Sequence, residues 1–221
     1  MNTTAYAGIA FRRLHPPTTD VGTVHHSLGA YLDRVTRHCT ALVDVLGDGF
    51  LRWWSCESGP RYGRYVFELL VEAAEDVRQR RGRSGVLACA GVAVFGPPSA
   101  EDADELLCVP VAVAQGLYAG AGLMFGAFVR DRAQADQHGR RLPGPAVSFV
   151  VVRPAVFPAD IALLERGGDD FVLPAAHDDG RDVFRDVLGG RARVRDAARH
   201  YPRVVAHLAA QEAVRREGVM T

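Results

Sequence analysis

The sequence VLACAGVAVF, at residues 86–95, is a continuous run of apolar and small residues that ends at Gly96-Pro97-Pro98. A short apolar run closed by residues that break regular structure is typical of a buried strand. Two further runs, GLMFGAFVR at residues 122–130 and AVSFVVVR at residues 146–153, have the same character. These three segments predict the centre of a sheet, and TAYAGIAFR, at residues 4–12, predicts a fourth strand.

Segments with the apolar spacing of helices lie between and around these predicted strands in the sequence. At residues 21–46 apolar side chains recur at steps of three and four, which predicts a long amphipathic helix. Residues 64–81 repeat the spacing, with acids early and arginines late, as suits the helix dipole. A third helix is expected from Ser99 towards Tyr118, kinked or interrupted at Pro110. Residues 157–166 predict a short helix, and residues 191–217 predict two because Pro202 lies among them.

Three stretches are predicted as loops: residues 50–63 with both tryptophans, residues 131–145 with several arginines, and the acidic, glycine-rich residues 167–182. No repeat or linker justifies a second domain, so residues 1–221 are expected to form one domain. The order of strands and helices predicts an α+β fold, with a mixed or antiparallel sheet of about four strands covered by helices.

All 26 positive side chains are arginines, and they balance 26 acidic residues. Because no lysine is present, mechanisms that need a deprotonated amine, such as Schiff-base and pyridoxal-phosphate chemistry, are excluded. Arginine cannot replace that group because its guanidinium stays charged. A genome rich in GC explains the bias itself. The zero net charge makes nucleic acid an unexpected partner.

The compartment is expected to be the cytoplasm, with no membrane partner. The N-terminal residues lack a basic start followed by a long apolar run, which a signal peptide requires. No stretch reaches the ~18 continuous apolar residues of a membrane span. The four cysteines are widely spaced, so neither a structural zinc site nor a redox dithiol is expected, and any metal ligand remains unknown.

Two clusters are candidates for a site, each with a plain structural alternative. His177-Asp178-Asp179, with Asp169 and Asp170 before it, could hold a hard cation or supply a general base, or could simply be a solvated loop. Trp53, Trp54, Cys56, Tyr62 and Tyr65 gather aromatic surface that could line a ligand or cofactor pocket, or close the core beneath a loop. The glycines of residues 116–126 do not have dinucleotide-site spacing.

Residues 86–164 carry a set of short motifs in a fixed order. They are Val94-Phe95-Gly96-Pro97, the segment GLMFGAF at residues 122–128, Pro145-Ala146-Val147, Arg153-Pro154 and Asp160-Ile161. In this order they resemble a family of small bacterial proteins associated with natural-product gene clusters. That family is similar to the YqcI/YcgG-like proteins, some of which are heme-dependent enzymes that oxygenate guanidine nitrogens.

The resemblance implies a small-molecule biosynthetic enzyme, with a heme-dependent oxidoreductase acting on an amino-acid-like substrate as one candidate. Arg153 would then hold a substrate carboxylate, Asp160 would orient the substrate, and His177 would complete the catalytic residues. Met124 and Cys56 are the candidate cofactor-binding residues.

Two residues depart from the family pattern. No Pro-Phe follows Cys56, and Pro154 stands where the family has a histidine. A cofactor-free cyclase or isomerase therefore remains an alternative. So does a non-catalytic accessory or binding protein, with a homodimer as its expected form.

Overall fold

The computed structural model describes residues 11–14, 21–35, 51–57, 62–95, 100–135, 139–155, 180–185, 201–202, 204–206 and 210. Five strands form the main sheet, in the order β1-β2-β3-β7-β4. They are β1 Phe11–Leu14, β2 Leu51–Glu57, β3 Cys89–Phe95, β4 Leu123–Phe128 and β7 Ser148–Pro154. β1, β2 and β3 are parallel, whereas β7 is antiparallel to β3 and β4, so the predicted α+β fold with a mixed sheet is confirmed.

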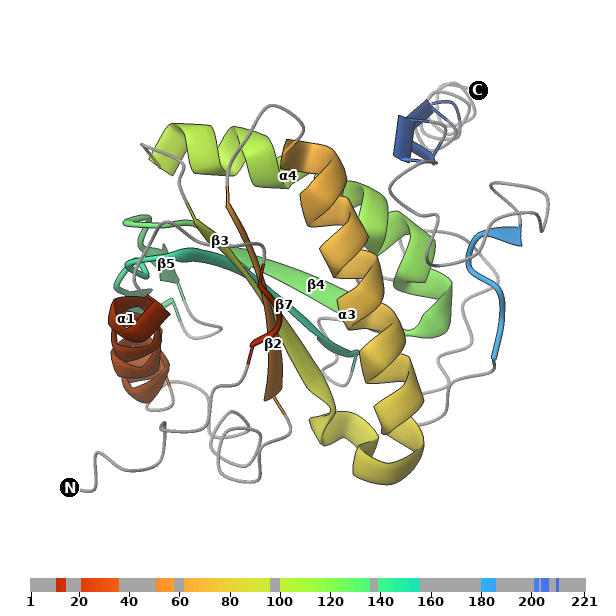
Figure 1. The fold of residues 1–221 in the computed structure, drawn as a ribbon, viewed down its shortest axis with the longest axis horizontal. Coiled ribbons are helices and arrows are strands. Elements are labelled where there is room, and N and C mark those ends of the chain that lie inside the picture. The colour runs from red at the N-terminus through yellow and green to blue at the C-terminus, as the bar shows by residue number, and fades with distance from the viewer. Residues whose placement is uncertain are drawn as a thin grey trace.

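Helices lie on both faces of this sheet, as Figure 1 shows. α3 (Tyr62–Ser84) and α4 (Ala100–Tyr118) pack on one face, and α1 (Val21–Val35) lies on the other. Short 3-10 turns, Gly85–Leu87 and Ala119–Ala121, lead into β3 and β4. Pro110 remains inside α4, where it is buried against Gly63 at the start of α3.

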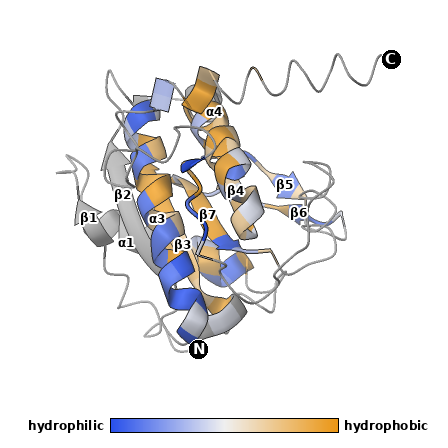
Figure 2. Cartoon of the chain, turned by 90° about the vertical axis from the view of Figure 1, so that its right-hand side faces the viewer, coloured by the Kyte–Doolittle hydropathy of each residue, from blue (hydrophilic) through white to orange (hydrophobic). Residues whose placement is uncertain are grey.

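The alternation of side chains along each strand divides the core in two. On the face of α3 and α4, Val92 and Val94 of β3 join a large apolar cluster that includes Phe67, Leu70 and Leu107. In Figure 2, α3 carries both hydrophilic and hydrophobic residues, whereas α4 is mainly hydrophobic. These side chains are almost fully buried, so this cluster is the principal apolar contribution to stability.

The cluster under α1 is smaller and more aromatic. Phe149 of β7 stacks on Phe128 at a centroid distance of 4.7 Å and meets the edge of Tyr31 at 5.8 Å. Leu28 and Leu32 complete the α1 side of the cluster. Offset and edge-to-face ring pairs add roughly 0.5–1.5 kcal/mol beyond the buried area.

β4 is the last strand of the described sheet, and glutamine side chains cover its outer edge. The Gln115 amide donates to the carbonyl of Leu123 at 3.0 Å and accepts from the N–H of Phe125 at 2.9 Å. Gln134 donates to the carbonyl of Ala127 at 2.9 Å. These contacts satisfy edge groups that would otherwise be open to pairing with another strand.

Two loop predictions are wrong. Residues 51–57 form β2 rather than a loop, because their backbone pairs with both β1 and β3. Residues 131–145 contain a two-stranded hairpin of β5 (Gln134–Ala135) and β6 (Arg141–Leu142). The other predicted segments, at residues 36–46, 157–166, 167–179 and most of 191–217, lie outside the described residues.

Candidate functional site

A surface pocket of about 280 Å³ lies between α3 and residues 180–184. Glu75, Arg78 and Gln79 line it from α3. On a helix, residues three and four positions apart share a face, so these three side chains point in one direction. We call this site the Glu75 pocket.

Glu75 is held at one carboxylate oxygen by two donors. Arg78 Nη1 donates to Glu75 Oε1 at 2.9 Å, and the Tyr118 hydroxyl donates to the same oxygen at 2.9 Å. Tyr118 is the last residue of α4, so this contact joins the two helices beside the pocket. The second oxygen, Oε2, makes no hydrogen bond with any described residue, and the Glu75 side chain is 20% exposed.

Tyr118 is a neutral donor in this network. Burial, followed by the negative charge and hydrogen bond of Glu75, raises the pKa of Tyr118 well above its ordinary value. Its ring also packs against Phe125 of β4 at a centroid distance of 5.9 Å. The hydroxyl therefore keeps its proton and a fixed direction, and it orients the carboxylate of Glu75.

The opposite wall of the pocket is anchored at three points. Arg78 Nη2 donates to the carbonyl of Arg181 at 2.7 Å, which links α3 directly to this segment. Val183 and Phe184 are buried in the large core cluster. The Asp182 carboxylate accepts from the N–H of Phe184 at 3.0 Å, which closes a local turn.

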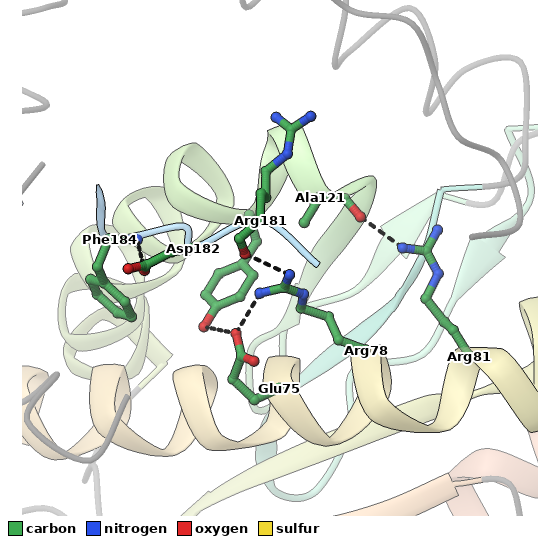
Figure 3. A network of polar contacts seen from close by, with 8 residues as sticks. Glu75, Arg78, Arg81, Ala121, Arg181, Asp182 and Phe184 are labelled. Atoms are coloured by element: carbon green, nitrogen blue, oxygen red, sulfur yellow. Dashed lines mark hydrogen bonds and ion pairs between the residues drawn. The ribbon is translucent and has the colours of Figure 1, made fainter. Parts of the chain in front are cut away.

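The Arg181 side chain lies beside Gly120. Figure 3 shows it extending away from Glu75. A Cβ at Gly120 would lie 2.5 Å from Arg181 Nη1, so the guanidinium keeps this place only because residue 120 has no side chain. The pocket thus combines two carboxylates, Glu75 and Asp182, with two guanidinium groups, Arg78 and Arg181.

One residue further along α3, a second ion pair has a different character. Asp76 and Arg80 are both buried, and Arg80 Nε lies 2.6 Å from Asp76 Oδ2. Arg80 Nη2 also donates to the carbonyl of Cys89 at 2.5 Å. Arg81 donates to the carbonyl of Ala121 at 2.7 Å. These contacts tie α3 to the starts of β3 and β4, and we assign them a structural role.

The structure brings two of the residues selected from the sequence together. Met124 of β4 and Arg153 of β7 are direct partners in the sheet register, on the face that α1 covers in part. Both side chains are half-buried, and Arg153 Nη1 donates to the carbonyl of Pro154 at 3.0 Å. They lie on the opposite face of the sheet from the Glu75 pocket.

The remaining selected residues do not join this pair among the described residues. Cys56 of β2 pairs with Val94, two strands away from β7 and toward the far end of the sheet. From the strand spacings, its backbone is roughly 15–20 Å from that of Arg153. Asp160 and His177 lie outside the described residues.

These positions bear on a heme or metal site. The two candidate cofactor-binding residues, Met124 and Cys56, lie on strands too far apart to contact one macrocycle from a shared pocket. Within the described ranges, no three His, Cys, Asp or Glu residues are grouped so that they could hold a metal ion. The described residues therefore do not bring Met124 and Cys56 together around one cofactor, and no chemical step is assigned to a heme.

Sequence reasoning missed the Glu75 pocket because its parts are far apart in the chain. Glu75 and Tyr118 are 43 residues apart, and Arg78 and Arg181 are 103 residues apart. The acids and arginines of α3 carry a sequence signal, but it is equally that of an ordinary exposed helix face. Only the packing of α4 against α3 distinguishes Glu75 from its neighbours.

No protein-family model, curated protein or solved structure matches this chain. None of the described helices has the length and apolar character needed to cross a membrane.

Proposed function

We propose that this chain is a biosynthetic enzyme that binds a small, amino-acid-like substrate in the Glu75 pocket. The observation that carries the proposal is the state of the Glu75 carboxylate. One oxygen is fixed by Tyr118 and Arg78, while the other makes no hydrogen bond with a described residue. A carboxylate held in this way is oriented in advance to accept a hydrogen bond or a proton from a ligand.

The charges of the pocket favour a zwitterion. Glu75 can accept a hydrogen bond from a protonated amine. The Arg181 side chain extends away from Glu75, so its positive charge is placed at a distance from the amine site, where it suits a carboxylate. Val183 and Phe184 also line the pocket. The volume, about 280 Å³, is just below the usual range for ligand pockets, which suits a molecule no larger than an amino acid.

The chemistry that fits this arrangement is acid–base catalysis without a cofactor, as in a cyclase or isomerase. Glu75 Oε2 would take a proton from a substrate carbon beside a carbonyl group. The C–H bond breaks, an O–H bond forms on Glu75, and the electron pair remains on the substrate as an enolate. Arg78 donates to the other carboxylate oxygen, Oε1, and so holds the group in place during the transfer.

Proton exchange tests this proposal. Purified protein is incubated in deuterated water with single amino acids, and loss of the carbon-bound proton is followed by NMR. We expect exchange with at least one amino acid, and a rate at least about 100-fold lower in Glu75→Gln, the usual range for loss of a general base. Glu72→Gln, one turn earlier on α3 and outside the pocket, is the matched control and should retain the rate.

Two other outcomes are informative. Binding of an amino acid without exchange or turnover would support the alternative of a non-catalytic binding protein. The heme-dependent version has its own test, an absorbance scan after expression with added heme. A Soret band would overturn the cofactor-free proposal, which predicts no band.

A further inference from the structure

The two sides of the Glu75 pocket are joined by one guanidinium group. Arg78 Nη1 donates to Glu75 Oε1 at 2.9 Å, and Arg78 Nη2 donates to the carbonyl of Arg181 at 2.7 Å (Figure 3). The first contact is an ion pair, whereas the second is made to a neutral backbone group. We call residues 180–184, which face α3 across the pocket, the pocket wall.

The pocket wall is attached differently at its two ends. Val183 and Phe184 are buried in the large core cluster. Arg181 is exposed, and its carbonyl is held by Arg78. The wall begins at Gly180, whose φ of 71° lies in the left-handed region that glycine adopts without strain. Burial therefore anchors one end of the wall, whereas the contact with Arg78 holds the other end against α3.

The hold of Arg78 on the wall is linked to the charge of Glu75. A carboxylate fixes a guanidinium more firmly than a neutral acceptor does, because a charge-assisted hydrogen bond is roughly twice as strong. Arg78 is also buried, where electrostatic contacts are stronger than in water. While Glu75 is negative, both donors of Arg78 keep one direction and reach the Arg181 carbonyl. When Glu75 is neutral, the guanidinium is less firmly oriented and this second contact weakens.

We propose that Arg78 is a positioning residue that couples the pocket wall to the charge of Glu75. A negative carboxylate keeps the wall docked on α3, and a neutral one releases its polar end while Phe184 stays in the core. The wall is then complete only while Glu75 can act as a base. This consequence for catalysis rests on the proposed function, whereas the coupling itself does not.

Amide hydrogen exchange of the full chain, without any ligand, tests the coupling. The N–H groups of Phe184 and Arg185 donate to Asp182 Oδ1 and to the Asp182 carbonyl, both at 3.0 Å, so they become exposed when Asp182 leaves the anchored end. We expect both amides to exchange about fivefold faster in Glu75→Gln, which removes the charge and keeps the shape. Arg78→Lys should accelerate them at least about tenfold, because a compact ammonium cannot bridge both partners as a planar guanidinium does.

The double variant separates coupling from a merely structural effect. If the carboxylate acts on the wall through Arg78, Glu75→Gln should accelerate exchange by less than about twofold once residue 78 is already lysine. Multiplication of the two single effects would mean that Glu75 and Arg78 act on the wall independently, and it would overturn the proposal.

Matched controls lie on the same helix. Arg83→Lys changes an exposed arginine and Glu72→Gln a carboxylate outside the pocket, and both should leave the exchange of the Phe184 and Arg185 amides unchanged. The amides of two strand residues at the centre of the sheet, Val92 and Val150, report on the whole fold.

Two results would contradict the coupling: unchanged exchange at Phe184 and Arg185 in Glu75→Gln, or equal acceleration of the wall and the sheet amides. No ligand is present in this experiment, so its outcome is separate from that of the proposed function. Failure to bind any amino acid would overturn the proposed function alone.

Discussion

Glu75 and Asp76 are adjacent carboxylates on α3 that the fold treats in opposite ways. Asp76 is buried, and its partner Arg80 is bound to the backbone of β3. Glu75 has a basic partner too, but it lines a pocket and keeps one oxygen without a hydrogen bond to a described residue. A closed ion pair fixes the helix in place, whereas an oriented, open carboxylate can act on a ligand. The two residues should therefore respond differently to substitution.

Removal of Asp76 should give the largest loss of stability. In Asp76→Ala the buried guanidinium of Arg80 loses its charged partner, and breaking a buried pair in this way costs about 3–5 kcal/mol. The free energy of unfolding, measured by urea titration, gives the value directly. A loss below about 1 kcal/mol would mean that this pair is not the structural contact we assign.

Tyr118→Phe should have an intermediate effect. It removes one donor to a charged acceptor and leaves the ring packing, so we expect a loss of about 1.5–2 kcal/mol. The same variant should weaken ligand binding because Glu75 loses its orientation. Urea titration and calorimetry on one preparation measure both effects; a change in stability with unaltered binding would make Tyr118 purely structural.

Alkaline pH should act through the same tyrosine. The pKa of Tyr118 is raised in the folded protein, so its stabilising contribution is complete below the unfolded value of 10.0 and is lost as pH rises beyond it. One such group gives a slope of about 1.4 kcal/mol per pH unit. Wild-type protein should therefore lose more stability between pH 9 and pH 11 than Tyr118→Phe does.

Two other tyrosines do not disturb that comparison. Burial also raises the pKa of Tyr31 and Tyr201, but both residues are present in each protein, so their contribution cancels. Identical alkaline slopes in the two proteins would contradict a buried, neutral Tyr118.

Glu75→Gln should cost the least stability. Glutamine is nearly isosteric and still accepts from Tyr118 and Arg78, so we expect a loss of about 1 kcal/mol or less in urea titration. A loss as large as that of Asp76→Ala would remove the distinction between the two carboxylates.

The sequence was sufficient for the elements with a strong local pattern. The apolar runs in residues 86–95, 122–130 and 146–153 contain β3, β4 and β7, and residues 64–81 lie within α3. β2 was missed because its place between β1 and β3 depends on pairing with both strands, which is a tertiary property. The hydrophobic pattern of one segment does not show which other strands it will pair with.

The site was less accessible for a related reason. Met124 and Arg153 were both selected from the sequence, and the register places them side by side. The Glu75 pocket depends on contacts between α3, α4 and residues 180–184, which no short motif records. A sequence does not show which charged side chain of a helix will be oriented toward a pocket, because that depends on how the neighbouring helix packs against it.

Calorimetric titration with amino acids tests the central claim, that Glu75 is the ligand-binding carboxylate. At a ligand concentration of 100 times Kd, binding should also stabilise the wild-type chain by about 2.7 kcal/mol. We expect at least one amino acid to bind wild-type protein and Glu72→Gln with equal affinity, and Glu75→Gln at least tenfold more weakly. Equal affinity for wild type and Glu75→Gln, or no binding of any amino acid to the wild-type protein, would contradict the account.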